Sequence, residues 1–459
     1  FFERHNPTVT LTWLLVLFFM PVLGFLLYVF LGQDLRKKKL FFLKEEEEKK
    51  FFPQLTQQGE SLNTNQLCFI NPRVSDYRNI IHLHLNSNQS LFTQNNSVEI
   101  FDDGQKLSQK MMKSMNRAEK YIHLEYYIIR NDDTGKAIRD ILAAKARSGV
   151  EVKLLYDGMG CLHLPRNFFK PLIVAGAEVS QFFPPFLPYI NLRLNYRNHR
   201  KICIIDGLEG YIGGFNIGDE YLGLSQAYGY WRDSHLLIKG SALDGLQLRF
   251  LLDWRYTCGY DFQVEEKYFP LRQAEGEIGV QIVSSGPDSK WSSIKDGYLR
   301  MISSAKQKVY IQTPYFVPDD SILEALKIAA LSGVDVILMI PGKADQPFVH
   351  WANLSYVSEL LEAGVRCFAY SKQRFLHSKV LMVDGFVSSV GTANMDIRSF
   401  DLNFEVNAFL YDEKVTRNLE KGFYRDLVNS DEILMEDYLK RPAGVRVKEA
   451  LCRLLSPLL

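Results

Sequence analysis

The chain has 459 residues, of which 47% are hydrophobic and 13% aromatic, a composition that supports sizeable packed cores and excludes a disordered protein. Its 54 lysines and arginines are balanced by 53 acidic residues, which leaves a net charge of +1. This balance argues against a nucleic-acid-binding protein, because such proteins usually carry a basic excess or a basic stripe.

An apolar segment near the start of the chain predicts a membrane anchor. Residues 9–31 contain no charged side chain, and at about 1.5 Å per residue a helix of this length crosses a hydrocarbon core of roughly 30 Å. Basic residues 36–39 follow, so the positive-inside rule places the remainder of the chain in the cytoplasm. We therefore predict a transmembrane helix over 9–31 and a juxtamembrane linker over 32–95. Because the chain begins with Phe1 rather than methionine, we expect residues to precede it.

Residues 438–459 at the other end mix basic side chains with leucine and valine at close to helical spacing. Such an amphipathic helix can lie on an anionic bilayer surface or pack on its own domain. The sequence leaves both alternatives open.

An internal repeat organises the chain between these ends. The stretch SGVEVKLLYDG, residues 148–158, is similar to SGVDVILMIPG, residues 332–342. Each follows a strand, an acidic turn and an amphipathic helix, so each unit is predicted to be β-turn-α-β. We therefore predict a duplicated α/β fold with a pseudo-two-fold axis, with its two halves at residues 96–262 and 263–459.

One polar pattern occurs once in each half. The first copy is NHRKICIID, residues 198–206, and the second is LHSKVLMVD, residues 376–384. Strand alternation puts the histidine and the lysine of each copy on one face, whereas the aspartate begins an Asp-Gly hairpin turn. We expect each aspartate to act mainly through this turn and its hydrogen bonds. The candidate catalytic residues are His199, Lys201 and Asp206 in the first copy and His377, Lys379 and Asp384 in the second.

A glycine-containing turn follows each aspartate and ends at an asparagine, Asn216 in the first half and Asn394 in the second. Small residues let a backbone approach a ligand closely, and lysine and asparagine side chains donate hydrogen bonds to the non-bridging oxygens of a phosphodiester. Two copies with matching offsets are far less expected by chance than one. The repeated pattern therefore predicts a phosphodiester-binding site.

These motifs resemble the phospholipase D superfamily, whose signature is H-x-K-x4-D followed by a glycine-rich turn and asparagine. Three further stretches make the chain similar to the bacterial cardiolipin synthases in particular. They are GGFNIGDEYLG (213–223), YWRDSHLLIKG (230–240) and IPGKADQPFVHWA (340–352). The resemblance covers nearly the whole chain, and it implies an enzyme of the bacterial cell membrane.

The resemblance implies a mechanism and a role for each site residue. His199 would attack phosphorus to form a phosphohistidine, and His377 would protonate the departing alkoxide. The lysines and asparagines would neutralise the phosphate without a metal or cofactor, and Asp233 and Glu405 would orient the imidazoles. The implied partners are phosphatidylglycerol and other anionic membrane lipids, with a phosphatidyl group transferred from one phosphatidylglycerol to another.

Several alternatives stay open. A phospholipase D type hydrolase, which forms phosphatidic acid, would differ only in admitting water to the phosphohistidine. The membrane segment and the balanced charge count against a nuclease, and a binding protein with degenerate motifs would be expected to lack a histidine or a lysine. The aromatic, proline-rich stretch 181–192 forms either a lip for acyl chains or a buried connection. The oligomeric state is also open, with a homo-oligomer as one alternative.

Overall fold

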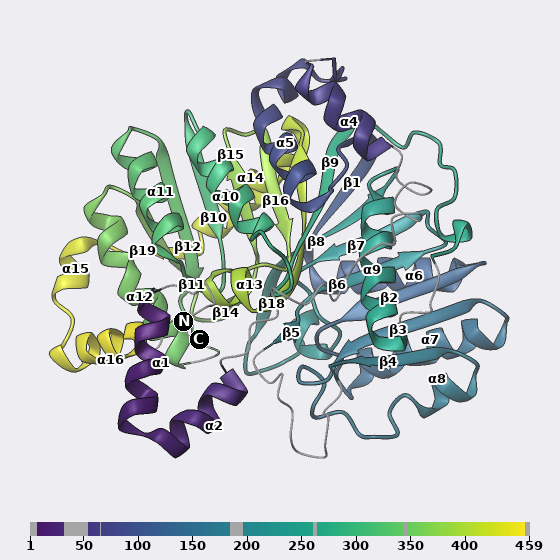
Figure 1. Cartoon of the computed structure of the whole chain (residues 1–459), viewed down its shortest axis with the longest axis horizontal. Helices are drawn as coiled ribbons and strands as arrows, with labels where there is room; N and C mark the ends of the chain where they lie inside the picture. The colour runs from purple at the N-terminus through teal and green to yellow at the C-terminus, as the bar shows by residue number, and fades with distance from the viewer. Residues whose placement is uncertain are drawn as a thin grey trace.

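Two α/β halves lie side by side in the computed structural model (Figure 1). The structure describes residues 7–31, 54–64, 66–183, 196–259, 264–343, 345 and 347–454. The predicted basic segment 36–39, most of the stretch 181–192 and the last five residues of the chain therefore lie outside the described residues.

The first half is built on a seven-stranded mixed sheet. Its strands are β1 (Thr93–Asp103), β2 (Tyr121–Tyr126), β3 (Glu151–Asp157), β4 (Glu178–Phe182), β6 (Lys201–Ile205), β7 (Glu209–Gly213) and β8 (Tyr230–Lys239). They pair in the order β4, β3, β2, β6, β7, β8, β1, and only the β2/β3 and β3/β4 pairs are parallel. The parallel strands β2 and β3 are joined through α7 (Asp133–Arg147), as expected for the predicted β-turn-α-β unit.

The second half repeats this order. Its strands are β9 (Ile278–Ser285), β10 (Lys308–Gln312), β12 (Asp335–Pro341), β13 (Arg366–Tyr370), β15 (Val380–Val383), β16 (Val387–Gly391), β18 (Asn403–Tyr411) and β19 (Ser430–Glu432). They pair in the order β19, β13, β12, β10, β15, β16, β18, β9. Apart from the additional edge strand β19, the two sheets match strand for strand, so the prediction of a duplicated α/β fold is confirmed.

Backbone pairing joins the halves at three places. The edge strands β1 and β9 pair antiparallel. The short strand β5 (Arg197–Asn198) of the first half pairs with β18, and β14 (Arg374–Leu376) of the second half pairs with β8. Because β5 and β14 lead directly into the two histidine motifs, each motif begins against the sheet of the other half.

Helices cover the sheets and enclose three hydrophobic cores. The first-half helices are α6 (Gly104–Arg117), α7 (Asp133–Arg147), α8 (Lys170–Val174) and α9 (Leu243–Cys258). The second-half helices are α10 (Ser293–Ser304), α11 (Asp320–Leu331), α12 (Pro347–Glu362), α13 (Ile397–Asp401), α14 (Glu413–Leu427), α15 (Met435–Leu439) and α16 (Ala443–Leu454). Aspartates cap the N-termini of α6, α7, α11, α13 and α14. One core is shared, because it joins Ile202 and Leu236 of the first sheet to Val390 and Val406 of the second.

The segment before β1 also belongs to the second half. It forms α4 (Gln54–Asn63), the 3-10 turn η1 (Pro72–Tyr77) and α5 (Arg78–Asn88). Ile81 and Leu85 of α5 pack in the same core as Ile294 and Met301 of α10. This part of the predicted linker is therefore folded against the domain that lies far downstream in the sequence.

The apolar N-terminal segment forms two short helices, α1 (Pro7–Phe19) and α2 (Pro21–Leu31). Pro21 lacks a backbone N–H and disfavours a helical conformation at the preceding residue, which explains the break. The two helices pack together, with the rings of Trp13 and Tyr28 5.3 Å apart. The structure thus divides the apolar segment into two helices and does not confirm the predicted transmembrane helix over 9–31. Within the described residues, no helix has both the length and the apolar character needed to cross a bilayer.

Candidate active site

Each motif histidine is held by the backbone of the opposite half. The N–H of His199 donates a 3.0 Å hydrogen bond to the carbonyl of Phe404 in β18. The N–H of His377 donates a 2.7 Å bond to the carbonyl of Arg232 in β8. These bonds extend the β5/β18 and β14/β8 pairs and bring the two imidazoles to one cleft between the halves.

The imidazoles are also oriented across the boundary between the halves. Nδ1 of His199 lies 2.9 Å from Oε2 of Glu405, and Nδ1 of His377 lies 2.6 Å from Oδ2 of Asp233. Both carboxylates are fully buried. With Nδ1 engaged by a carboxylate, Nε2 is the nitrogen of each ring that can react. Both carboxylates are the ones proposed from the sequence, and each lies beside the histidine of the other half.

A cavity of about 550 Å³ contains this site. Only 10% of the His199 side chain and 9% of the His377 side chain are exposed. Both histidines and both motif asparagines line the cavity, together with Tyr127, Arg130, Arg197, Glu220, Trp231, Tyr315, Asp345, Asp396, Arg398 and Asn403. The ring of Tyr127 contacts His199, and the ring of Trp231 contacts His377. The walls are therefore aromatic and charged, and the two motif histidines lie at the boundary between the two halves.

The motif lysines lie beneath the histidines and are fully buried. Nζ of Lys201 donates to the carbonyl of His199 at 2.6 Å, and Nζ of Lys379 donates to the carbonyl of His377. Burial lowers the pKa of Lys201 to about 7 and that of Lys379 to about 8, although Glu405 and Asp233 oppose the shift. The pKa of each lysine thus lies near neutral pH. An anion bound in the cleft would therefore stabilise the charged form of each side chain.

Burial has the same effect on the histidines. It lowers the pKa of His199 to about 4 and that of His377 to about 3, and the nearby lysines add to the shift. Glu405 and Asp233 oppose it, and their own pKa values lie below the usual range despite burial, because each is bonded to an imidazole near a lysine. Without a ligand both imidazoles are therefore neutral at pH 7, which is the form that attacks as a nucleophile.

The two asparagines are placed differently. Asn394 is buried and lines the cavity, and its Oδ1 has no hydrogen-bond partner among the described residues. Oδ1 of Asn216 accepts a 3.3 Å bond from the N–H of Ile128 at the cavity wall. The preceding glycine turn has a packing role as well, because a side chain on Gly214 would collide with the Asp233 carboxylate.

The motif aspartates are not part of the cavity lining. Asp206 accepts three bonds of 2.8–2.9 Å from the N–H groups of residues 119–121, and Asp384 accepts three from residues 306–308. Both aspartates have φ near +50° at the β6/β7 and β15/β16 hairpins. Each therefore ties its hairpin to the start of a neighbouring strand, the turn role that the Asp-Gly signal predicts.

Two buried arginines support the site and were not identified from the sequence. Nε of Arg200 donates to the carbonyl of Glu405 at 3.2 Å, and its Nη1 lies 2.7 Å from Asp253. Nη1 of Arg232 donates to the carbonyl of Asp233 at 2.5 Å, and its Nε lies 2.8 Å from Asp426. Both could have been identified in the sequence, because each arginine stands next to a site residue within an otherwise buried strand segment.

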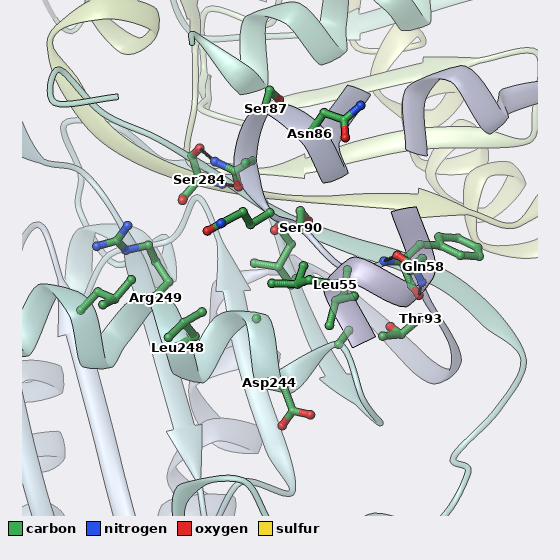
Figure 2. A pocket seen from close by; sticks show the side chains of 18 of the residues that line it. Leu55, Gln58, Asn86, Ser87, Ser90, Thr93, Asp244, Leu248, Arg249 and Ser284 are labelled. Atoms are coloured by element: carbon green, nitrogen blue, oxygen red, sulfur yellow. Dashed lines mark hydrogen bonds between the residues drawn. The ribbon is translucent and has the colours of Figure 1, made fainter. Parts of the chain in front are cut away.

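The cleft is not the largest cavity. A cavity of about 760 Å³ lies between α4, α5, β9 and α9 and contains none of the motif residues. Figure 2 shows Gln58, Asn86 and Arg249 among its lining residues. Because the histidines, lysines and asparagines converge elsewhere, we assign the chemistry to the smaller cleft.

A duplicated α/β fold with one histidine from each half in a shared cleft, each above a buried lysine, defines a phospholipase D-like protein. The family model described as "Cardiolipin synthase, PLD-like domain" matches residues 111–235 and 298–427, and a "Phospholipase D-nuclease N-terminal" model matches residues 1–33. The chain belongs to this cardiolipin synthase family.

Relatives of known name agree with this assignment. The chain is 48% identical over its full length to the major cardiolipin synthase ClsA of Bacillus subtilis, with 95% of that protein covered. It is 47% identical over its full length to a cardiolipin synthase of Staphylococcus aureus, with 93% covered.

Among solved structures, phosphatidylserine synthase of Haemophilus influenzae matches with a TM-score of 0.64 at 14% identity. The match covers 83% of this chain and 100% of that chain. At this identity the likeness concerns the fold alone.

Proposed function

We propose that this protein is a cardiolipin synthase that transfers a phosphatidyl group from one phosphatidylglycerol to another and releases glycerol. The observation that carries the proposal is the pair of carboxylate-bound histidines that face one cleft above two buried lysines. The names of the full-length relatives supply the substrate class and the product.

The proposed reaction has two steps that use the same two histidines. In the order that the family resemblance implies, Nε2 of His199 attacks phosphorus, the bond from phosphorus to the glycerol oxygen breaks, and His377 gives its proton to that oxygen. A hydroxyl of the second phosphatidylglycerol then gives its proton back to His377 and attacks phosphorus. The bond from phosphorus to His199 breaks, which regenerates the enzyme and forms cardiolipin.

The electrostatics of the cleft support this scheme. His377 must carry a proton in the first step, although burial lowers its pKa in the empty cleft. A bound phosphodiester anion beside it raises the affinity of the ring for a proton, and Asp233 stabilises the resulting imidazolium. Lys201 and Lys379, with Asn216 and Asn394, are proposed to neutralise the non-bridging oxygens.

We also propose that the apolar α1/α2 hairpin enters the lipid bilayer and that the two halves face the cytoplasm. Phe18, Phe19, Val22 and Phe25 each expose more than half of their surface, and such a cluster is costly in water. Helix α16 packs on α12, where Arg453 bonds to Glu359 and the ammonium group of Lys448 lies over the ring of Trp351. Its exposed Val447, Leu451 and Leu454 offer a second apolar surface for the membrane.

The test is to incubate the detergent-purified protein with phosphatidylglycerol and a chelator while measuring cardiolipin, free glycerol and phosphatidic acid together. Equal amounts of cardiolipin and glycerol are expected. Phosphatidic acid without cardiolipin would mean that water takes the phosphatidyl group, and the protein would then be a phospholipase D type hydrolase.

A further inference from the structure

The two flanks of the cleft are built from equivalent elements but differ in charge. Arg197 lies two residues before His199, whereas the equivalent position before His377 holds Phe375. Arg398 lies four residues after Asn394, whereas the equivalent position after Asn216 holds Glu220. The His199 flank therefore carries two arginines where the His377 flank carries a phenyl ring and a carboxylate.

The two arginines converge although they come from different halves. Arg197 in β5 pairs with Asn403 in β18, and α13, which contains Arg398, leads directly into β18. Both side chains line the cavity. Burial is the main cause of a lowered pKa for Arg398, and the charge of Arg197 lowers it further. The second effect is expected for guanidinium groups that lie near each other.

Two carboxylates lie close to this pair. Asp396 lines the same cavity and accepts a 2.5 Å hydrogen bond from the N–H of Ser399, and burial raises its pKa to about 6. Asp157 is buried outside the cavity lining, and burial raises its pKa although the charge of Arg197 opposes the shift. Among the charged side chains that line the cavity on this flank, the two guanidinium groups therefore outnumber the carboxylate of Asp396.

On the opposite flank, one guanidinium group and two carboxylates line the cavity. Arg130 lies 2.9 Å from Oε1 of Glu220, and the hydroxyl of Tyr315 donates a 2.5 Å bond to Asp345. The side chain of Phe375 is fully buried. Arg130 on this side is thus already bound to a carboxylate of its own half.

The proposed reaction requires two phosphodiester anions in the cleft at once. The donor phosphate reacts between the two histidines, where Lys201 and Lys379 supply the compensating charge. The acceptor lipid brings a second phosphate, separated from the attacking hydroxyl by a single glycerol. Guanidinium groups bind phosphate oxygens through paired, charge-assisted hydrogen bonds, so a pair of arginines suits a second phosphodiester.

We propose that Arg197 and Arg398 form a subsite for the phosphodiester of the acceptor phosphatidylglycerol. This inference rests on the proposed function and adds to it the residues that select a phospholipid, in place of water or free glycerol, as the acceptor. A neutral acceptor has no group for this subsite, and its reaction is independent of the two arginines.

The experiment compares two acceptors that share one donor. Purified wild-type protein and the Arg197→Gln, Arg398→Gln and double variants receive phosphatidylglycerol in neutral detergent micelles. One assay measures cardiolipin, and the other measures exchange of isotopically labelled glycerol into phosphatidylglycerol, which reverses the first step. Arg417→Gln, which removes an exposed arginine outside the cavity lining, is the matched control, and melting temperatures report folding.

We expect the double variant to lose cardiolipin formation by about tenfold or more, with a raised KM for phosphatidylglycerol, as loss of charge-assisted bonds predicts. Glycerol exchange should stay within about threefold of wild type, because a change of that size is worth less than 1 kcal/mol. An equal loss of both reactions would overturn the proposal by placing the arginines at the donor site, and unchanged cardiolipin formation would overturn it directly.

Two further measurements distinguish the subsite from a membrane-docking role and from a failure of the proposed function. If the variants bind phosphatidylglycerol vesicles less well and recover full activity in micelles, the arginines dock on the bilayer surface and the subsite proposal is wrong. If wild-type protein forms phosphatidic acid and no cardiolipin, the proposed function fails before any variant is compared.

Discussion

Nδ1 of His199 lies 2.9 Å from Oε2 of Glu405, although the two residues belong to different halves of the chain. The converse pair joins His377 to Asp233 at 2.6 Å. Each half thus supplies the imidazole of one pair and the carboxylate of the other. Neither half holds a complete pair by itself, so packing of the halves is a condition for catalysis as well as for stability.

This exchange predicts that Glu405→Gln and Asp233→Asn each lower kcat by about 10²- to 10⁴-fold, because an amide neither fixes the imidazole tautomer nor stabilises the imidazolium. Cardiolipin formation measures the effect, and thermal unfolding checks that the variant is folded. The amides preserve the shape of the buried groups, so a folded variant with near-normal kcat would contradict the orienting role of these carboxylates.

The sequence predicted the features that depend on local pattern. Periodicity and the repeated motif were sufficient to predict the duplicated α/β fold. The Asp-Gly signal was sufficient to predict the hairpins at residues 206 and 384. The division of residues 9–31 into two helices did not follow from the apolar pattern, because the absence of charge describes polarity and not helix continuity.

Features that depend on contacts between distant residues were not predictable from spacing. Nothing in the motif shows that Glu405 bonds to His199 rather than to His377, since that depends on how the sheets pack. The same holds for Arg200, whose guanidinium reaches the carbonyl of Glu405 across the shared core. The ring contact between His84 of α5 and Phe409 of β18, at 4.2 Å between centroids, likewise joins residues far apart in the sequence.

Asp206→Ala and Asp384→Ala should reduce stability without removing activity. Each change deletes the acceptor of three backbone N–H bonds and places alanine at a φ near +50°. We expect the free energy of unfolding to fall by about 2–4 kcal/mol, with kcat per folded molecule close to wild type. Chemical denaturation and activity assays at low temperature measure the two quantities.

The Asn variants at these positions are the controls. Asparagine tolerates a positive φ and keeps one oxygen acceptor, so its loss of stability should be smaller than that of alanine. If Asp206→Asn were fully stable but inactive, the aspartate would act in the chemistry and its assignment to the turn would be wrong.

His199→Ala and His377→Ala should each reduce cardiolipin formation to background, because one step lacks its nucleophile and the other its acid. Substantial turnover by either variant would exclude a two-histidine mechanism. In the wild type, a rapid alkaline quench with labelled phosphatidylglycerol should preserve a phosphorus–nitrogen adduct on the peptide that contains His199. An adduct on the His377 peptide would reverse the two roles.

The buried lysines predict the pH dependence of the enzyme. Burial lowers the pKa of Lys201 to about 7 and that of Lys379 to about 8. A lysine is charged below its pKa, so rising pH removes both positive charges from beneath the phosphate between about pH 7 and 8. Because kcat/KM reports the free enzyme, we expect its decline with rising pH to become steeper above pH 7, with a further slope that approaches two protons above pH 8.

The substrate-bound enzyme provides an internal check on the role of the lysines. A phosphodiester anion stabilises the charged ammonium groups, so the alkaline limb of kcat should lie at higher pH than that of kcat/KM. Lys201→Arg keeps its charge at high pH and should flatten the slope toward that of one proton even where its overall rate is low. Glycerol release measured from pH 5 to 10 provides all three profiles, and a kcat/KM that stays level through pH 9 would show that neither lysine loses its proton in the free enzyme.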